Sequence, residues 1–148
     1  MNMIFIPFKQ VGIFKLDDDV NNYSDVLINY FHRPDKIFDG EYYEYYHSAE
    51  PYSAEDSHML QVVDGKIRAV FCDESLIYNG VNLIGLTIDE LKNITNSDYV
   101  GEIYEADLFD DKPPMYDYDF DDIGITARTH YGRIVDIIAS GYWSYEDD

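Results

Sequence analysis

Hydrophobic residues recur every three to four positions in two stretches of this chain, as they do along one face of an amphipathic helix. In the first stretch the apolar positions are Val20, Tyr23, Val26, Leu27, Tyr30 and Phe31. This spacing predicts a helix over 20–32, with acidic residues at its positive N-terminal end and Pro34 just beyond it. In the second stretch Thr87 and Glu90 form a capping-box pattern, which predicts a shorter helix that ends near Thr95.

Short runs of apolar, β-branched and aromatic residues make up most of the remaining chain. They predict strands over 3–8, 10–16, 37–46, 58–63, 66–72, 76–83, 100–107, 123–129 and 133–140. Asp64-Gly65 and Tyr131-Gly132 lie between apolar runs and predict tight hairpin turns. The stretches 49–57 and 108–122 are the least regular. The second contains Pro113-Pro114, which cannot donate to a β-ladder, so it is expected to form a surface loop.

Two helices and many short strands joined by turns predict an α+β fold with a largely antiparallel sheet. No linker rich in Gly, Ser or Pro divides the chain, so 1–148 is expected to form one domain. Two halves, about 10–75 and 78–145, also resemble each other weakly. Gly12 and Gly80 are 68 positions apart, and Gly65 and Gly132 are 67 apart, which raises the hypothesis of an internal repeat.

The net charge of the chain indicates which classes of partner it can bind. Its 148 residues contain 30 acidic and 10 basic side chains, which gives a net charge of −20. Such a field repels polyanions, so direct binding to nucleic acid or to an anionic membrane is not expected. With 15 Tyr and 8 Phe along its length, the chain is far richer in aromatic residues than disordered acidic segments are. A folded domain that binds a basic protein is the interpretation this composition favours.

The compartment is predicted from three absences in the sequence. The single Cys72 cannot form an intramolecular disulfide, and its apolar neighbours indicate a small buried strand residue. The N-terminus lacks the pattern of a signal peptide, and no segment reaches the roughly 20 apolar residues of a transmembrane helix. These features together favour a cytoplasmic protein.

The acidic stretch 107–122 alternates carboxylates with aromatic rings. An EF-hand loop would place Asp117, Asp119 and Asp121 at its first ligand positions, but Asp122 replaces the required Gly and Arg128 the final Glu. A solvated acidic loop without a role stays a plain alternative. Rings beside carboxylates are also typical of protein interface hot spots. The candidate partner-binding residues of this stretch are Asp107, Asp110, Asp111, Tyr116, Asp117, Tyr118, Asp119, Asp121 and Asp122.

A second Tyr-rich acidic cluster lies at 41–46. Strand alternation would put Tyr43 and Tyr45 on one face and the residues between them on the other. One of these faces would present tyrosines and acids to a basic partner, although ordinary strand propensity explains the tyrosines equally well. The candidate partner-binding residues of this cluster are Glu41, Tyr42, Tyr43, Glu44 and Tyr46.

No motif of catalysis or cofactor binding stands out in the sequence. The four histidines show no paired ligand spacing, there is no cysteine pair, and the patterns of a P-loop, a dinucleotide fingerprint and a serine nucleophile elbow are absent. We therefore expect no catalytic residue, no bound metal and no cofactor. A small hydrolase with paired carboxylates stays an alternative that would need a pocket and an acid of raised pKa.

A small, acidic, Tyr-rich α+β domain of this kind resembles the immunity proteins that bacteria make against their own toxins, particularly those of contact-dependent growth inhibition systems with nuclease toxins. The resemblance lies in overall character, in the charge and in the segments 41–46 and 107–122, and no motif matches residue by residue. It implies one cognate partner, a basic toxin domain whose substrate cleft is blocked. The alternatives are a nucleic-acid mimic that inhibits DNA-binding proteins and a small acidic scaffold or accessory domain.

Overall fold

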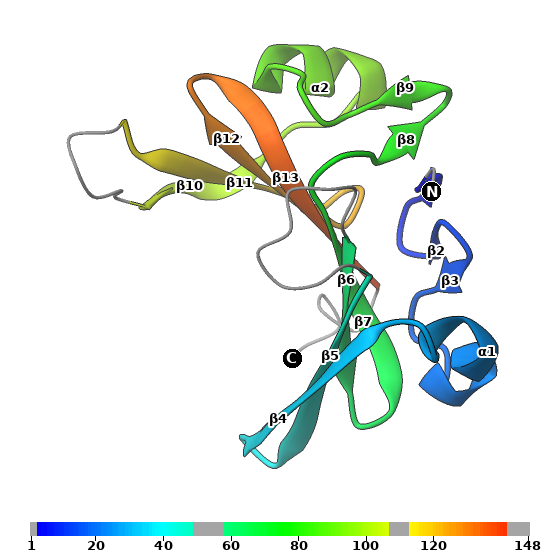
Figure 1. Ribbon diagram of the computed structural model, residues 1–148. Coiled ribbons are helices and arrows are strands. Elements are labelled where there is room, and N and C mark those ends of the chain that lie inside the picture. The colour runs from blue at the N-terminus through cyan, green and yellow to red at the C-terminus, as the bar shows by residue number, and fades with distance from the viewer. Residues whose placement is uncertain (1–2, 49–57, 107–112, 142–148) are drawn as a thin grey trace.

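The computed structural model describes residues 3–48, 58–106 and 113–141. It is mostly antiparallel β-sheet with two short helices, which agrees with the predicted class although strands dominate more than expected. Figure 1 shows the main sheet bent so that its two ends point apart, with the helices and the small hairpins packed on one side of it. None of the described helices is long and apolar enough to cross a membrane.

The main sheet has eight strands in the order β10-β11-β12-β13-β7-β6-β5-β4, and all neighbours are antiparallel. Its strands are β4 (Phe31–Phe38), β5 (Glu41–His47), β6 (His58–Val63), β7 (Lys66–Cys72), β10 (Val100–Ala106), β11 (Met115–Phe120), β12 (Ile125–His130) and β13 (Arg133–Ser140). Strands β7 and β13 join at the centre, where Phe71 pairs with Ile138, so β4 and β10 form the two edges.

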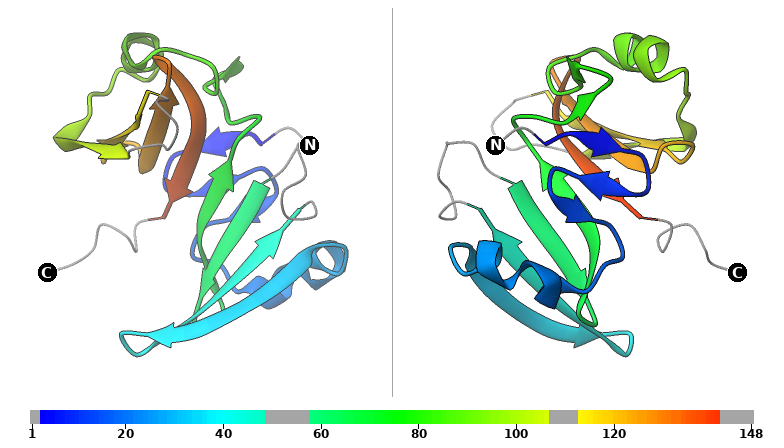
Figure 2. Two further views of the ribbon diagram at one scale, coloured as in Figure 1. Left: turned by 60° about the vertical axis from the view of Figure 1, so that its left-hand side comes forward. Right: turned by 90° about the vertical axis from the view of Figure 1, so that its right-hand side faces the viewer.

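A second layer covers one face of this sheet (Figure 2). Two small sheets belong to it, one of β1 (Phe5–Ile6), β2 (Gln10–Val11) and β3 (Phe14–Lys15) and one of β8 (Ile77–Tyr78) and β9 (Val81–Asn82). The 3-10 helix η1 (Val20–Tyr23) with α1 (Ser24–Leu27), and α2 (Ile88–Thr95), complete the layer. The core lies between the two layers, and its largest fully buried side chains include Phe14, Phe120, Leu60 and Leu91. Burying these apolar surfaces is the main force that holds the layers together.

The second predicted helix is confirmed. The Glu90 backbone N–H donates to Thr87 Oγ1 at 3.2 Å, and the Thr87 N–H donates to Glu90 Oε1 at 3.0 Å, so both hydrogen bonds of the capping box are present. Asn96 ends the helix in the left-handed conformation, with φ of 51°. Leu91 is fully buried beneath the helix.

The first predicted helix, over 20–32, is wrong in its second half. Only η1 and α1 are helical, and Phe31 and His32 already belong to β4, where they pair with His47 and Tyr46. Of the two apolar residues at the end of the helical pattern, Tyr30 packs edge-on against Phe14, and Phe31 is exposed on β4. The pairing of β4 with β5 has therefore overridden the helical spacing of apolar residues in this stretch.

Several predicted strands are divided by turns. The stretch 37–46 is split into β4 and β5 by Asp39-Gly40, and 76–83 is split into β8 and β9 by Asn79-Gly80. Each of these pairs has positive φ at both residues, as do the predicted turns at Asp64-Gly65 and Tyr131-Gly132, which are confirmed. Two positive φ values match the type I′ turn, whose twist suits a hairpin. The stretch 10–16 is likewise a hairpin of β2 and β3.

The expected loop over 108–122 is wrong over 115–120. Residues 115–120 form strand β11 inside the main sheet, between β10 and β12. Alternation explains the result, because Phe120 is fully buried on one face while Asp117 faces the other. Charges confined to one face of a strand do not prevent it from pairing. Pro113 and Pro114 precede the strand. Residues 108–112 of this predicted loop, and all of the other predicted loop, 49–57, lie outside the described residues.

Both halves of the chain follow the order of hairpin, helix and four strands. The Leu16 N–H donates to the Lys9 carbonyl at 2.8 Å, and the Leu83 N–H donates to the Leu76 carbonyl at 2.8 Å, 67 positions further along. The register shift between Gln61 and Val62 recurs between Arg128 and Thr129 at the same offset. These matches fit the offsets seen in the sequence; that the halves arose by duplication stays a prediction.

Candidate functional site

The face of the main sheet that points away from the core carries the charged and aromatic side chains of interest. Across β11, β12 and β13, Asp117 pairs with Arg128 and Arg128 pairs with Asp136 in the register of the strands. Their neighbours Ala127 and Ile137 point the other way and are fully buried. The row Asp117, Arg128 and Asp136 therefore lies on the side opposite the core.

Asp117 is held by a two-point ion pair. Arg128 Nε donates to Asp117 Oδ1 at 2.8 Å, and Arg128 Nη2 donates to Asp117 Oδ2 at 3.2 Å. The hydrogen bond to Asp117 raises the pKa of the Arg128 guanidinium further above its usual range. Asp117, a predicted partner-binding residue, is thus already paired with a cation of its own chain.

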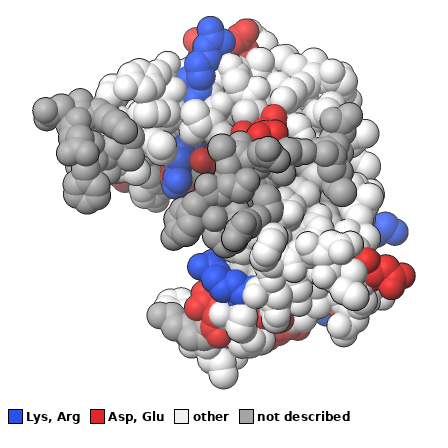
Figure 3. Space-filling view, in the orientation of Figure 1, with Lys and Arg blue, Asp and Glu red and all other residues white. Residues whose placement is uncertain are grey.

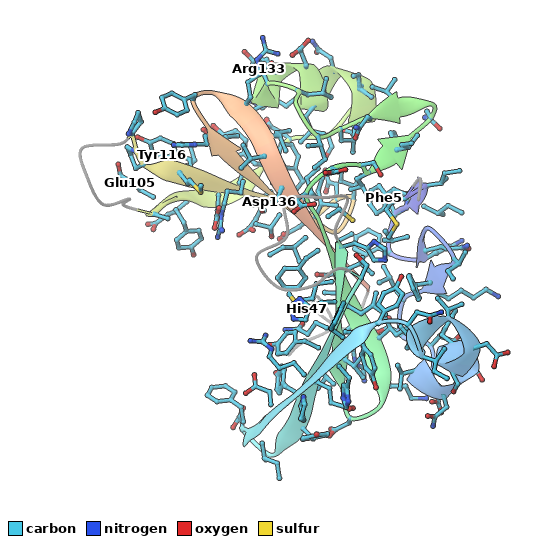
Figure 4. All side chains as sticks on the ribbon, viewed as in Figure 1. Phe5, His47, Glu105, Tyr116, Arg133 and Asp136 are labelled. Atoms are coloured by element: carbon cyan, nitrogen blue, oxygen red, sulfur yellow. The ribbon has the colours of Figure 1, made fainter. Side chains whose placement is uncertain are left out.

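Asp136 is the third member of this row, and no sequence pattern marked it. Partial burial raises its pKa above the ordinary value of 3.8, and although Arg128 lowers it, the negative charges of Asp117 and Asp73 raise it further. The Arg128 guanidinium thus interacts with two carboxylates, Asp117 and Asp136. Asp136 is labelled in Figure 4.

The other predicted residues of β11 and its following turn have mixed settings. Asp119 accepts a hydrogen bond from Thr126 Oγ1 at 2.7 Å. Asp121 and Asp122 are exposed in the turn after β11, and partial burial, with repulsion from Asp119 and Asp122, raises the pKa of Asp121. Two carboxylates of this set are therefore exposed, whereas two are engaged by the neighbouring strand.

The two tyrosines of β11 lie on the same strand face as Phe120, but only one of them packs against the core. Tyr118 packs edge-on against Tyr99, with ring centroids 5.1 Å apart, and lies against the core. Tyr116 is at the surface, and its hydroxyl donates to Glu105 Oε1 of β10 at 3.3 Å (Figure 4). The predicted residues Asp107, Asp110 and Asp111 lie outside the described residues.

Strand β5 shows the alternation that the sequence predicts. Glu44 and Tyr46 face the helix layer, where Glu44 Oε1 lies 2.8 Å from His32 Nε2 and the His32 ring stacks on Tyr46 at 4.5 Å. Tyr46 also packs against the core. Glu41 and Tyr42 begin the strand at the hairpin, where the Tyr42 N–H donates to Asp64 Oδ1 at 2.9 Å.

The opposite face of β5 lines a groove of about 380 Å³. Its lining residues are Asp35, Phe38, Tyr43 and Tyr45. The Phe38 and Tyr43 rings meet edge-on, with centroids 6.4 Å apart and planes at 77°. Above Tyr45, the guanidinium carbon of Arg33 lies 4.6 Å from the ring centroid.

Of these groove residues only Tyr43 was a predicted site residue. Asp35, Phe38 and Arg33 were missed because β4 was not predicted as one strand, and 33–36 fell between the expected helix over 20–32 and the expected strand over 37–46. The Asp39-Gly40 dipeptide was the signal that would have revealed a hairpin there. Tyr45 was placed on the correct face with Tyr43 but was not counted among the candidates.

Several carboxylates act on Tyr43, which lines one end of the groove. The pKa of Tyr43 is raised above 10.0 mainly by partial burial and further by the negative charges of Glu41, Asp39 and Asp64. Figure 3 shows acidic and basic side chains together over the β4–β5 end of the molecule. In that view the acidic groups are scattered among uncharged surface and do not form one continuous patch.

Large apolar side chains are exposed on both edge strands of the main sheet. Phe31 is 48% exposed, Ile37 is 70% exposed and Phe38 is 63% exposed, all on edge strand β4. The other edge strand, β10, exposes Ile103 and Tyr104. Contiguous exposed apolar groups ringed by polar ones are typical of interaction surfaces.

Within the described part of the chain, no group of three or more His, Cys, Asp or Glu side chains is arranged to hold a metal ion. No family model matches the chain, and neither a curated protein nor a solved structure is significantly similar to it.

Proposed function

We propose that this protein is an immunity protein, which binds one basic toxin domain, for example a nuclease, and covers the toxin's positively charged substrate site. The observation that carries the proposal is the coincidence of two features at the β4–β5 end of the sheet. Ile37 and Phe38 are exposed there on an edge strand, and the charges of Asp39, Glu41 and Asp64 act on the neighbouring Tyr43. In a chain of net charge −20, such a surface suits a basic partner.

The physical reason is that a nuclease must hold phosphates with Lys and Arg, so its active site is its most positive surface. Carboxylates presented to that site attract it over long distances and can bring association toward 10⁸ to 10⁹ M⁻¹s⁻¹ at low salt, as an order of magnitude. Aromatic and aliphatic side chains at the centre then exclude water and slow dissociation. The carboxylates would therefore set the association rate, and the apolar side chains would set the lifetime of the complex.

The internal contacts favour one of the two sequence candidates. Asp117 and Asp119 of the 107–122 stretch already have partners on β12, so a toxin would have to compete with them. The β4–β5 surface has exposed rings and a groove that no described strand covers. The proposal therefore places the centre of binding on β4–β5, with exposed Asp121 and Asp122 as acidic contacts elsewhere on the sheet.

The test is calorimetric titration of this protein with the C-terminal domain encoded by the gene immediately upstream, at low and at high salt. We expect tight one-to-one binding that weakens as salt rises, and loss of the partner's toxicity on co-expression. Absence of binding would contradict the proposal. Comparable binding to several unrelated DNA-binding proteins would instead favour nucleic-acid mimicry, because an immunity protein recognises a single partner.

A further inference from the structure

We propose that the groove between β4 and β5, lined by Asp35, Phe38, Tyr43 and Tyr45, is a binding site for an Arg or Lys side chain of the protein's partner. The proposal rests on the proposed function only for the identity of that partner. The chemistry of the site stands on the groove itself.

Among the described side chains, the groove is lined by three aromatic rings and one carboxylate. Ring faces attract cations through their quadrupole, and the attraction is strongest where water is displaced. An exposed carboxylate at the same groove supplies the hydrogen-bond acceptor that a guanidinium or ammonium needs. Because Phe38 meets Tyr43 edge-on at 77°, the contact occupies a face of only one of the two rings, and a cation can lie against a face outside the contact.

The protein's own Arg33 shows that this surface accepts a cation. Its guanidinium lies over the Tyr45 ring, and Arg33 and Tyr45 are direct partners in the register of β4 and β5. Arg33 occupies the Tyr45 end, so the Phe38 and Tyr43 end is where a second cation would bind. Its repulsion of that second cation is opposed by Asp35, Asp39, Glu41 and Asp64, and the last three already act on the pKa of Tyr43.

Other occupants fit less well. An anion would be repelled by these carboxylates, and a metal ion would find one carboxylate in a lining that is otherwise aromatic. A purely apolar side chain would offer Asp35 no hydrogen-bond donor, and covering the carboxylate without one would cost free energy.

The groove favours side-chain insertion over addition of a partner strand to the sheet edge. Pro34 lies within β4, and the pairing of β4 with β5 shifts register between Pro34 and Ile37. Proline and irregular register both discourage a further strand from pairing along an edge. We therefore infer that the partner presents its cation from an extended or helical segment that lies across β4.

The test uses a synthetic seven-residue peptide that alternates Arg and Val, titrated into the intact protein and followed by NMR. A matched peptide with citrulline in place of Arg keeps the shape and removes the charge. We expect the Arg peptide to shift the ring resonances of Phe38 and Tyr43 more than those of other aromatic residues, and the citrulline peptide to have little effect. Largest shifts on β10 and β11 would overturn the proposal.

Variants separate ring chemistry from general attraction to an acidic protein. Phe38→Leu keeps an apolar side chain but removes the ring, and Asp35→Asn removes the charge. Each is expected to weaken peptide binding by about tenfold, equivalent to about 1.4 kcal/mol. The controls are Tyr104→Leu, an exposed ring on the other edge strand, and Glu74→Gln, an exposed carboxylate between β7 and β8. If the controls weaken binding as much as the groove variants, the groove is not the site.

The same variants distinguish this proposal from the proposed function. If the toxin domain binds the wild type and Phe38→Leu equally, the groove proposal fails and the immunity function stands. If no toxin binds but the peptide occupies the groove, the function fails and the groove proposal stands. Thermal denaturation of each variant checks that it is folded. If Phe38→Leu fails to fold, Asp35→Asn still tests the proposal, because Asp35 is exposed.

Discussion

At the level of single residues, the carboxylates of this chain differ in what they can offer a partner. Asp117 is neutralised by Arg128, and Glu44 lies beside His32. Asp19 accepts a hydrogen bond from the Asn21 N–H and caps η1. The net charge of −20 therefore describes the long-range field of the molecule, whereas contact with a partner depends on the smaller set of exposed carboxylates.

Asp136 leads to a prediction about stability and pH. Its pKa is raised in the folded protein, so keeping it ionised costs stability at pH values above that pKa, and the cost vanishes below the ordinary value of 3.8. Asp136→Asn removes the cost. We expect the variant to be more stable than the wild type toward urea at pH 7, and the difference to shrink as the pH falls toward 4.

Glu74→Gln controls for the general effect of removing one negative charge. If the two variants gain equally at pH 7, the effect belongs to the net charge of the protein and not to the burial of Asp136. A loss of stability in Asp136→Asn would mean that attraction to Arg128 outweighs the burial of the carboxyl group.

At the level of elements, the sequence predicts best where local signals and tertiary pairing agree. Strands β6, β7 and β13 have the predicted bounds, because their apolar runs are bounded by X-Gly turns. Helix α2 follows its capping box. Cys72 is buried in β7, as its apolar neighbours indicate.

The wrong predictions have a common origin, because the same residue pattern is compatible with two kinds of secondary structure. Tyr30 and Phe31 fit the helical period of the preceding residues, yet Phe31 opens β4 because His47 is its strand partner. The alternating Asp and Tyr residues of β11 are typical of a solvated loop, and the sequence does not show that Phe120 at the end of this stretch is buried in the core. The groove was missed for the same reason, since its residues come together only when β4 pairs with β5.

The capping box of α2 gives a prediction at this scale. Thr87→Ala removes the acceptor of the Glu90 N–H and should lower the free energy of unfolding by about 1 kcal/mol in urea denaturation. Thr87→Ser keeps a hydroxyl and should cost much less. Equal losses in the two variants would show that the threonine methyl group, and not the cap, provides the stability.

At the scale of the whole molecule, the two halves use corresponding places of the sheet differently. The cross-strand row Arg33, Tyr45 and Gln61 in the first half corresponds to Tyr104, Asp117 and Arg128 in the second, with Gln61 and Arg128 67 positions apart. In the first half a cation lies on a ring beside an open groove. In the second half a guanidinium binds a carboxylate of the same chain. Sequence alone could not reveal this difference, because it depends on the pairing of β4 with β5 and of β11 with β12, and neither β4 nor β11 was predicted with these bounds.

The net charge makes a final prediction, in which salt acts with opposite signs on folding and on binding. Thirty carboxylates against ten cations repel one another in the folded state, and this repulsion destabilises it. Raising sodium chloride from about 0.01 M to about 0.15 M shortens the Debye length from about 30 Å to about 8 Å. The Tm of the protein alone should therefore rise over this range, while its affinity for the basic partner falls. Potassium chloride should give the same shift if ionic strength is the cause, and a Tm that falls with salt would mean that internal pairs such as Asp117 and Arg128 outweigh the repulsion.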